Sequence, residues 1–287
     1  MPAFICTRCG SQYRNSEAPP AGCLICQDER QYVDPAGQAW TTQEALRKTH
    51  FNAFRRLETG LMGIGTLPSF AMGQRALLLR TPEGNILWDC ISFLDDATLT
   101  LIAALGGIST IACSHPHFIG AAVEWSHAFK NAPVYVHGMD RQYVPHLDSV
   151  ISFWEADRLE LAEGVTMIRC GGHFPGSSVL HWDKGGANGD GALLTGDTLQ
   201  VRPDKGLSFM HSYPNMIPLD AQTVERIGET LAPWPFGTLY GGWWDRVIPV
   251  NASQVLASSV ARYIGAVTGK PGFPVYSEVF IGEAEDL

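Results

Sequence analysis

The chain has 287 residues, of which 45% are hydrophobic, and this composition predicts one large domain or a medium domain with a small appendage. Its 20 basic and 29 acidic residues give a net charge of −9, and no run of Lys or Arg is present, so we expect no nucleic-acid partner. The N-terminus shows no signal-peptide pattern, and no uninterrupted apolar stretch reaches about 18 residues. These features predict a cytoplasmic protein with no membrane partner.

Four cysteines near the N-terminus form two Cys-x-x-Cys pairs, "CTRC" (Cys6 and Cys9) and "CLIC" (Cys23 and Cys26). Each pair bends into a knuckle that directs two thiolates at one ion, and two knuckles complete a tetrahedral site that suits structural zinc. We expect a short hairpin with its turn at residues 17–22, and folding energy supplied by the metal. Rubredoxin-like iron, a redox dithiol and simple buried thiols are the alternatives. The short spacing favours a zinc ribbon.

We place this four-cysteine zinc-ribbon module at residues 1–40 and a second domain at residues 41–287. Thr41 and Glu44 have capping-box spacing and predict a helix within residues 40–58. Further predicted strands cover residues 75–81, 86–90, 108–113, 132–137, 165–170, 178–183 and 192–197. Further predicted helices cover residues 95–107, 119–131, 220–231 and 251–267, the last capped by Asn251. Strand hairpins mixed with strand–helix units predict a layered α/β or α+β fold.

Side chains of the metal-ligand type follow four of the apolar strands. They are Asp89, the pair His115 and His117, His173, and Asp197. Because strand ends at one edge of a layered sheet converge, we expect these side chains to share a site. In an extended backbone, residues two apart face the same way, so His115 and His117 can bind one ion together. The pattern predicts a metal-binding pocket.

At these residues the sequence resembles the metallo-β-lactamase superfamily of metallohydrolases. "SHPHF" matches the opening of that family's T-H-x-H-x-D-H motif, "GGHFPGSSVL" its G-H-T-P-G-S segment and "LLTGDTL" its G-D-T-L segment. The resemblance covers about residues 60–265 and implies a four-layer αββα sandwich. It also implies that His115, His117 and His173 bind the first metal. Asp197 is then the carboxylate that usually bridges two metals.

Two departures from the family pattern remove the ligands exclusive to the second metal. The family motif continues with an aspartate and a histidine, whereas here "HPHF" runs directly into "IGAA". The last family histidine is expected around Gly242 and Trp243, where no histidine stands. The resemblance therefore implies a pocket that holds one ion, zinc or iron, with Asp89 in the family's usually structural acidic position. In active relatives the missing aspartate positions the attacking water, so other residues would have to take that part.

Two loops contain candidates for that part. His211 and Tyr213 lie in a loop with the features of a pocket lid, and Asp245 lies in the loop where the last histidine is expected. These three are the candidate catalytic residues. The candidate substrate-pocket residues are Trp243, Trp244 and Arg246. The alternative is that each of these residues, taken singly, only packs at the core or its rim.

Three functions fit this sequence. The leading hypothesis is a hydrolase with a small-molecule substrate, in which one bound ion activates water. The second is a mononuclear-iron oxidoreductase resembling the persulfide dioxygenases, with His115, His173 and Asp197 as a facial triad and His117 not bound. The third is a non-catalytic metal-binding or interaction protein with a degenerate site. The substrate and the oligomeric state stay open.

Overall fold

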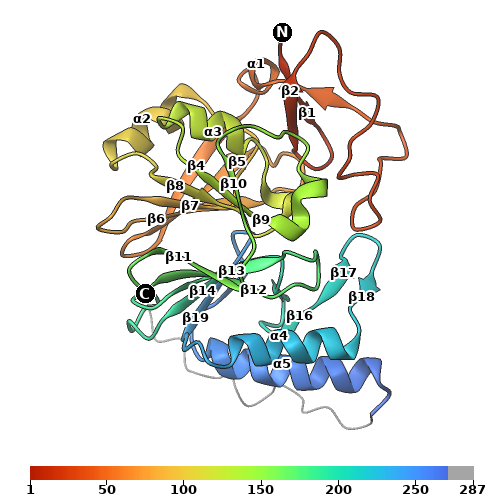
Figure 1. Cartoon of the computed structure of the whole chain (residues 1–287), viewed down its shortest axis with the longest axis vertical. Coiled ribbons are helices and arrows are strands. Elements are labelled where there is room, and N and C mark those ends of the chain that lie inside the picture. The colour runs from red at the N-terminus through yellow and green to blue at the C-terminus, as the bar shows by residue number, and fades with distance from the viewer. Residues whose placement is uncertain (271–287) are drawn as a thin grey trace.

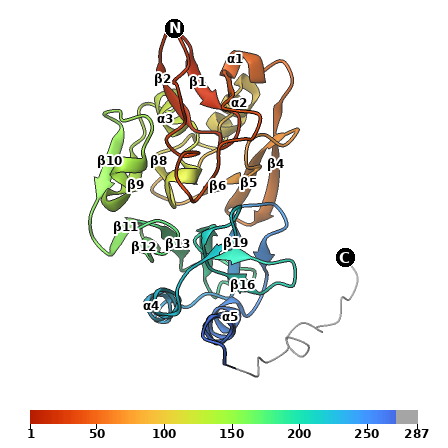
Figure 2. The ribbon, with the colours of Figure 1, turned by 90° about the vertical axis from the view of Figure 1, so that its right-hand side faces the viewer.

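The computed structural model describes residues 1–270; residues 271–287, which belong to the predicted second domain, lie outside the described part. Two β-sheets lie face to face, and a pair of helices covers the outer face of each (Figures 1 and 2). The helices are α2 (Asp96–Ala104) and α3 (Ala122–Ala128) on one side and α4 (Ala221–Leu231) and α5 (Ala252–Val267) on the other. The predicted αββα sandwich is confirmed.

The first sheet has seven strands in the order β10-β9-β8-β7-β6-β5-β4. Its strands are β4 (Phe51–Glu58), β5 (Leu61–Leu67), β6 (Arg75–Leu79), β7 (Ile86–Trp88), β8 (Thr110–Ala112), β9 (Val134–His137) and β10 (Ile151–Trp154). Strands β4 to β7 pair antiparallel, whereas β7 to β10 run parallel. The parallel strands β7 and β8 therefore end at the same edge, where Asp89 and His115 follow them.

The second sheet has six strands in the order β11-β12-β13-β14-β19-β20. Its strands are β11 (Arg158–Ala162), β12 (Val165–Arg169), β13 (Ser178–Trp182), β14 (Ala192–Gly196), β19 (Thr238–Gly241) and β20 (Val247–Ile248). Strands β12 and β14 run in the same direction because each pairs antiparallel with β13. His173 and Asp197 therefore emerge at one edge of this sheet.

Three apolar layers hold the sandwich together. The middle layer joins the two sheets, with Trp88 from the first sheet and Met167 and Leu194 from the second among its buried members. Outer layers join the first sheet to α2 and α3, and the second sheet to α4 and α5. Burial of this apolar surface, at about 25 cal/mol per Å², is the main driving force for the fold. Within residues 1–270, no helix combines the length and the apolar character that crossing a bilayer requires.

The N-terminal segment forms a separate sheet in the order β2-β1-β3, with β1 (Ala3–Cys6), β2 (Gln12–Asn15) and β3 (Trp40–Thr41). The turn between β1 and β2 is the first cysteine knuckle itself, closed by a 2.9 Å hydrogen bond from the Gly10 amide to the Cys6 carbonyl. The predicted hairpin turn at residues 17–22 is therefore wrong. Strand β3 pairs with β1 and so spans the predicted boundary at residue 40.

The helix predicted within residues 40–58 is wrong beyond its first turn. Helix α1 covers only Gln43–Leu46, and its N-cap is Thr42 rather than Thr41. The segment Phe51–Glu58 instead forms β4, because pairing with β5 overrides its helical pattern. Asn251 stands at the N-cap of α5, but its side chain makes no capping hydrogen bond.

The remaining described elements are short. Two 3₁₀ helices, η1 (Pro116–Phe118) and η2 (Gly138–Tyr143), follow β8 and β9. Two small hairpins separate Asp197 from α4. They consist of β15 (Gln200–Val201) with β16 (Leu207–Ser208), and β17 (Met210–Ser212) with β18 (Ile217–Pro218).

Candidate metal centre

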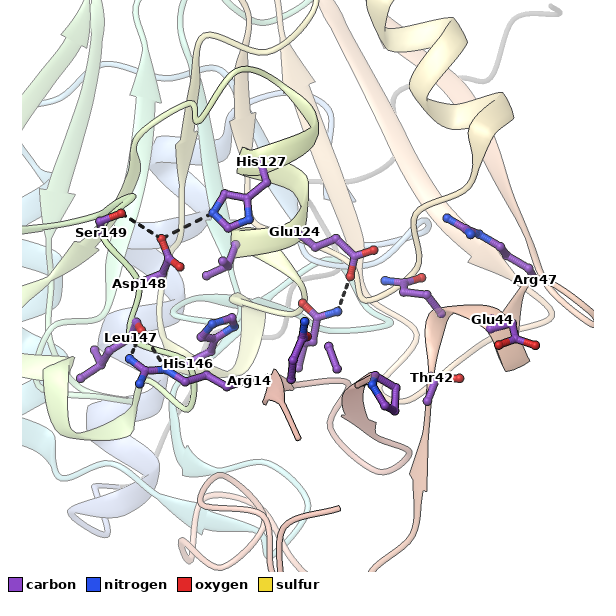
Figure 3. A pocket seen from close by; sticks show the side chains of 16 residues that line it. Arg14, Thr42, Glu44, Arg47, Glu124, His127, His146, Leu147, Asp148 and Ser149 are labelled. Atoms are coloured by element: carbon purple, nitrogen blue, oxygen red, sulfur yellow. Dashed lines mark hydrogen bonds and ion pairs between the residues drawn. The ribbon is translucent and has the colours of Figure 1, made fainter. Parts of the chain in front are cut away.

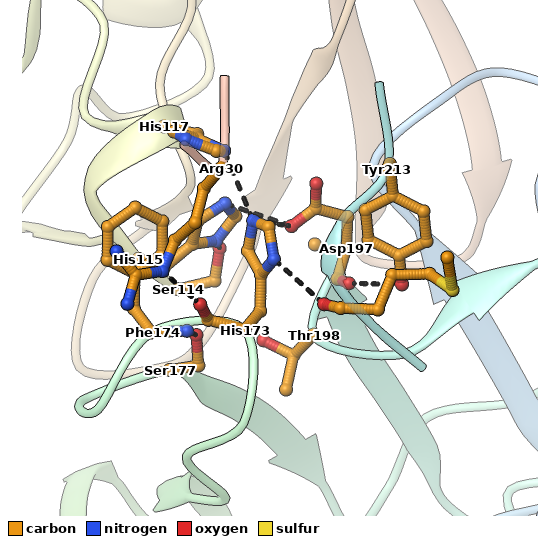
Figure 4. A network of polar contacts seen from close by, with 12 residues as sticks. Arg30, Ser114, His115, His117, His173, Phe174, Ser177, Asp197, Thr198 and Tyr213 are labelled. Carbon is orange, nitrogen blue, oxygen red and sulfur yellow. Dashed lines mark hydrogen bonds and ion pairs between the residues drawn. The ribbon is translucent and has the colours of Figure 1, made fainter. Parts of the chain in front are cut away.

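Four buried side chains from three loops meet at the shared edge of the two sheets (Figure 4). Potential ligand atoms of His115, His117, His173 and Asp197 all lie within 4.8 Å of one another. Nε2 of His115 is 2.9 Å from Oδ1 of Asp197, and Nε2 of His173 is 3.8 Å from the same oxygen. Nε2 of His173 is also 3.2 Å from Nδ1 of His117. The fold thus brings together all four residues that the sequence proposes as ligands.

Several atoms of this cluster lack hydrogen-bond partners. Nε2 of His115, Nε2 of His117 and Oδ1 of Asp197 are buried, and none makes a hydrogen bond of normal geometry to the described residues. Two of these atoms, Nε2 of His115 and Oδ1 of Asp197, lie only 2.9 Å apart, but this contact does not have the geometry of a normal hydrogen bond. Buried polar atoms normally have partners, because burying them unpaired costs about 1–3 kcal/mol each. Three imidazoles and one carboxylate arranged in this way fit one zinc or iron ion.

In two of the imidazole rings, a hydrogen bond at Nδ1 determines that Nε2 is the nitrogen that faces the cluster. Nδ1 of His173 donates to the Met210 carbonyl oxygen at 3.0 Å, which leaves Nε2 as an acceptor. Nδ1 of His115 lies 2.8 Å from the Ser114 hydroxyl, so its Nε2 also faces the cluster. Such outer partners fix the ring orientation of metal-binding histidines.

The protonation states of His117, His173 and Asp197 suit a cation, whereas at His115 the Asp197 carboxylate outweighs burial and raises the pKa of the imidazole. Burial lowers the pKa of His173 to about 4 and holds the pKa of His117 well below its usual range. Burial opposes ionisation of Asp197, but the adjacent imidazoles, His115 first, outweigh it and lower the pKa of this carboxyl. At neutral pH two imidazoles are therefore neutral donors beside an ionised carboxylate.

The strand ends that carry these residues are held together tightly. Oδ1 of Asp89, directly after β7, accepts a 2.7 Å hydrogen bond from the Ser114 amide, directly before His115. Gly196, at the end of β14, has φ +56°, and a Cβ there would lie 2.5 Å from the Ser114 hydroxyl. Only glycine permits this approach of β14 to the loop after β8. Asp89 therefore has the structural place that the resemblance implies.

The backbone between the two neighbouring histidines differs from the predicted extended form. His115 is extended at φ −169°, but His117 lies inside η1, which begins at Pro116. The turn, rather than a straight strand, directs His117 toward His173. Proline favours this first helical position because its φ is already fixed near the helical value.

A cavity of about 330 Å³ opens onto the cluster. His117, His173 and Asp197 form its floor, and Tyr213 and Trp243 form part of its wall. The N-terminal segment supplies a further part through Arg8, Arg30 and Gln31. These three residues could not be found from the sequence, because no spacing pattern links the cysteine segment to the strand-end motifs.

The candidate catalytic residues separate in the structure. Tyr213 reaches the cavity, but its hydroxyl is 2.9 Å from the Asp197 carbonyl oxygen, so it supports the ligand loop. His211 is not a lining residue of the cavity; its Nε2 is 2.8 Å from Oε1 of Glu29 in the N-terminal segment. Asp245 is exposed and lies at a different pocket.

The candidate pocket residues separate too. Trp243 lines the metal cavity, packs at 5.5 Å on the Phe118 ring and donates from Nε1 to the Met72 carbonyl at 2.9 Å. Trp244 and Arg246 line a neighbouring pocket of about 670 Å³. The Trp243 indole therefore stands in the wall near the place expected for the missing histidine.

The four N-terminal cysteines form a second cluster. Their sulfur atoms lie within 4.8 Å of one another, with Cys6 to Cys26 at 3.6 Å and Cys9 to Cys23 at 3.5 Å. A zinc ion with sulfur ligands at about 2.3 Å has S–S separations of about 3.8 Å in a tetrahedron, close to these distances. None of the four forms a disulfide. Gln38 and Tyr13 direct a donor at Cys6 and Cys23, at 3.2 and 3.4 Å.

A pocket of about 1080 Å³, larger than the cavity at the metal cluster, lies elsewhere in the described part of the chain (Figure 3). It lies between the N-terminal segment and the loops around α3, with Arg14, Glu124, His127 and Asp148 among its lining residues. Oδ1 of Asp148 pairs with His127 at 3.5 Å, and Gln12 donates to Glu124. Asp148 and Glu124 in this pocket thus each have a side-chain partner, unlike the atoms of the metal cluster.

Residues 71–244 match the sequence profile of the Metallo-beta-lactamase superfamily. The Uncharacterized protein YmaE of Bacillus subtilis (strain 168) is 44% identical over 273 residues, which covers 94% of this chain and 98% of that protein. Because so little of this chain is left outside that alignment, the similarity extends into the cysteine segment.

Solved structures show the same fold at low sequence identity. VMB-1 at pH 5.5 superposes with a TM-score of 0.56 at 13% identity, covering 75% of this chain and 98% of that chain. The DIM-1 metallo-beta-lactamase gives a TM-score of 0.56 at 11% identity, with the same two coverages of 75% and 98%. At this low sequence identity, the two matches show similarity of the sandwich fold alone.

Proposed function

Since this chain belongs to the metallo-β-lactamase superfamily, we propose that it is a hydrolase with one metal ion bound by His115, His117, His173 and Asp197. The observation that carries the proposal is the convergence of four buried ligand side chains, three of whose ligand atoms make no normal hydrogen bond to the described residues. The cavity volume of about 330 Å³ supports a small-molecule substrate, since ligand pockets start at about this size. We place the activity in the cytoplasm, where paired thiols stay reduced.

The expected chemistry follows from this donor set. A zinc ion bound there would supply a Lewis acid that activates water and polarises a carbonyl or phosphoryl oxygen of the substrate. The residues of the chain hold the ion, shape the cavity and exclude bulk water. Gln200 is a lining residue of the cavity, and its buried Oε1 has no hydrogen-bond partner among the described residues, so the amide has an unused acceptor for a water. This amide is our candidate for the part of the missing aspartate.

A single ion is proposed because the described residues form only two clusters of three or more potential ligands. One is the cysteine cluster, and the other is the His/Asp cluster. All four ligands of the second cluster lie within 4.8 Å, which supports a four-ligand site over a three-ligand triad that leaves His117 aside. The iron oxidoreductase and the non-catalytic protein are outcomes of the test below.

The test combines metal counting with activity. The purified protein is stripped, reloaded with zinc and measured by elemental mass spectrometry, and ester, thioester, lactam and phosphodiester substrates are assayed. We expect two zinc ions per chain and hydrolysis of at least one class. His173→Ala should retain one zinc and lose the activity, while Cys170→Ala, a matched change outside both clusters, should keep both.

Other outcomes decide between the hypotheses. Iron as the pocket metal together with oxygen consumption would favour the oxidoreductase. A fully loaded protein that is inert toward all four substrate classes would sink the hydrolase proposal and favour the non-catalytic function.

A further inference from the structure

We propose that Arg8, inside the first cysteine knuckle, binds an anionic group of the substrate, a carboxylate or a phosphate, beside the metal centre. The inference rests on the proposed function and narrows its substrates to small anionic molecules. It also gives the cysteine module a place in the substrate site itself.

The position of Arg8 is set by the fold of the knuckle. It stands between Cys6 and Cys9 and lines the same cavity as His117 and Asp197. The guanidinium lies 3.9 Å from the centre of the Tyr32 ring. Stacking occupies the face of a guanidinium and leaves its N–H edge available for a planar anion. The side chain is therefore oriented before any ligand arrives.

The other cavity arginine is already engaged. The Arg30 guanidinium pairs with Asp28 at 2.8 Å and donates from Nε to the His173 carbonyl at 2.7 Å. Arg8, in contrast, makes no ion pair and no side-chain hydrogen bond with residues 1–270. A half-buried cation without a counter-ion is what a site for an external anion requires.

The charges around the cavity favour the same ligand. Asp197 is the one carboxylate among the described residues that line it, and Arg30 is neutralised by Asp28. A divalent ion on the cluster exceeds the charge of Asp197, and Arg8 adds a further positive charge at the wall. Focused positive potential in a small cavity attracts anions. An anionic substrate would place its charged group at Arg8 and its reacting group over the cluster.

The test is calorimetric titration of the zinc-loaded protein with two probes, inorganic phosphate and acetate. Charge-assisted hydrogen bonds contribute about 1.5–3 kcal/mol, which corresponds to roughly 10- to 100-fold in affinity. We expect Arg8→Gln to weaken binding of at least one probe by tenfold or more, and Arg8→Lys to weaken it less. Whichever probe depends more on Arg8 identifies the group as phosphate or carboxylate.

Arg14→Gln is the matched control, because Arg14 belongs to the same module but lines the other pocket (Figure 3). Arg14→Gln should leave the affinities for phosphate and acetate within about twofold of those of the wild type. Zinc counts on every variant test whether both metals are retained. If Arg8→Gln lost zinc, probe affinities of the charge-preserving Arg8→Lys would be compared with those of Arg14→Gln. This comparison would still measure the contribution of the Arg8 guanidinium to probe binding.

The results separate this inference from the proposed function. Unchanged probe binding in Arg8→Gln with two zinc ions per chain would overturn the anion site alone and leave the hydrolase intact. Failure of the loaded wild type to bind either probe would overturn it as well. Absence of zinc from the His/Asp cluster would instead overturn the proposed function.

Discussion

Nε of Arg30 donates a 2.7 Å hydrogen bond to the carbonyl oxygen of His173, and this bond joins the cysteine-rich segment to the metal-ligand loop (Figure 4). The same guanidinium lies 4.5 Å from the centre of the Phe174 ring, next to that ligand. Its Nη1 donates to both carboxylate oxygens of Asp28 at 2.8 Å, which holds the guanidinium in place. The N-terminal segment is therefore part of the support of the metal centre.

Replacing Arg30 should weaken the His/Asp site. Outer partners of metal ligands typically contribute 10- to 100-fold in metal affinity. We expect Arg30→Gln to lower the zinc affinity of this site about tenfold in competition titrations with a chromophoric chelator. Arg14→Gln in the same segment serves as the control. Equal affinities for the Arg30 variant and the wild type would show that the contact does not position His173.

Disrupting the cysteine cluster should affect both metals. In Cys26→Ala we expect loss of one zinc, rapid proteolysis within residues 1–40 and weaker zinc binding at the His/Asp site, because a segment this small depends on its metal for folding. Elemental mass spectrometry and limited proteolysis measure these effects. A variant that keeps the wild-type protease pattern and full affinity at the His/Asp site would show that the two sites are independent.

The buried carboxyl of Asp89 predicts a pH dependence of stability in the metal-free protein. Burial raises the pKa of Asp89 to about 7, whereas an aspartate in an unfolded chain has a pKa of about 3.9. The folded state therefore binds the proton more tightly, so the contribution of Asp89 to stability is greatest at acid pH and falls as the pH rises from about 4 through 7.

Asp89→Asn removes that titration. Asn keeps the acceptor for the Ser114 amide and tolerates the left-handed φ of +60° at this position. We expect the free energy of unfolding to rise by on the order of 2–4 kcal/mol at pH 8 and by little at pH 4, measured by denaturant titration with a chelator present. An equal change at both pH values would rule out the carboxyl as its cause.

Trp244 is expected to act through packing rather than through substrate contact. A Cβ added at Gly65 would lie 2.8 Å from the Trp244 ring, and the Arg75 guanidinium is 5.6 Å from the centre of that ring. Gly65→Ala should therefore destabilise the protein by about 1–3 kcal/mol. In Gly65→Ala combined with Trp244→Ala the clash is absent, so the cost should be smaller than the sum of the single changes by about 1 kcal/mol. Strict additivity in denaturant titrations would contradict this packing.

The candidate ligands could be predicted from the sequence because their motifs have short-range spacing. The Cys-x-x-Cys pairs, the His115–His117 pair and the acidic residue after an apolar strand each follow local backbone geometry, and strand ends of a layered sheet meet at an edge whatever the loop lengths. For that reason a layered α/β or α+β fold and the identity of the clustered residues could be predicted from local pattern, whereas the four-layer αββα arrangement was implied by the resemblance to the metallo-β-lactamase superfamily.

Tertiary structure decided what local pattern leaves open. Phe51–Glu58 is a strand because β5 pairs with it, and Trp244 turns away from the cavity because Gly63 and Gly65 make room for its ring on the sheet. The places of Arg8 and Arg30 depend on how the cysteine segment packs across the metal centre. Contacts between segments so distant in the chain are set by the packing of the whole molecule, which no spacing within either segment encodes.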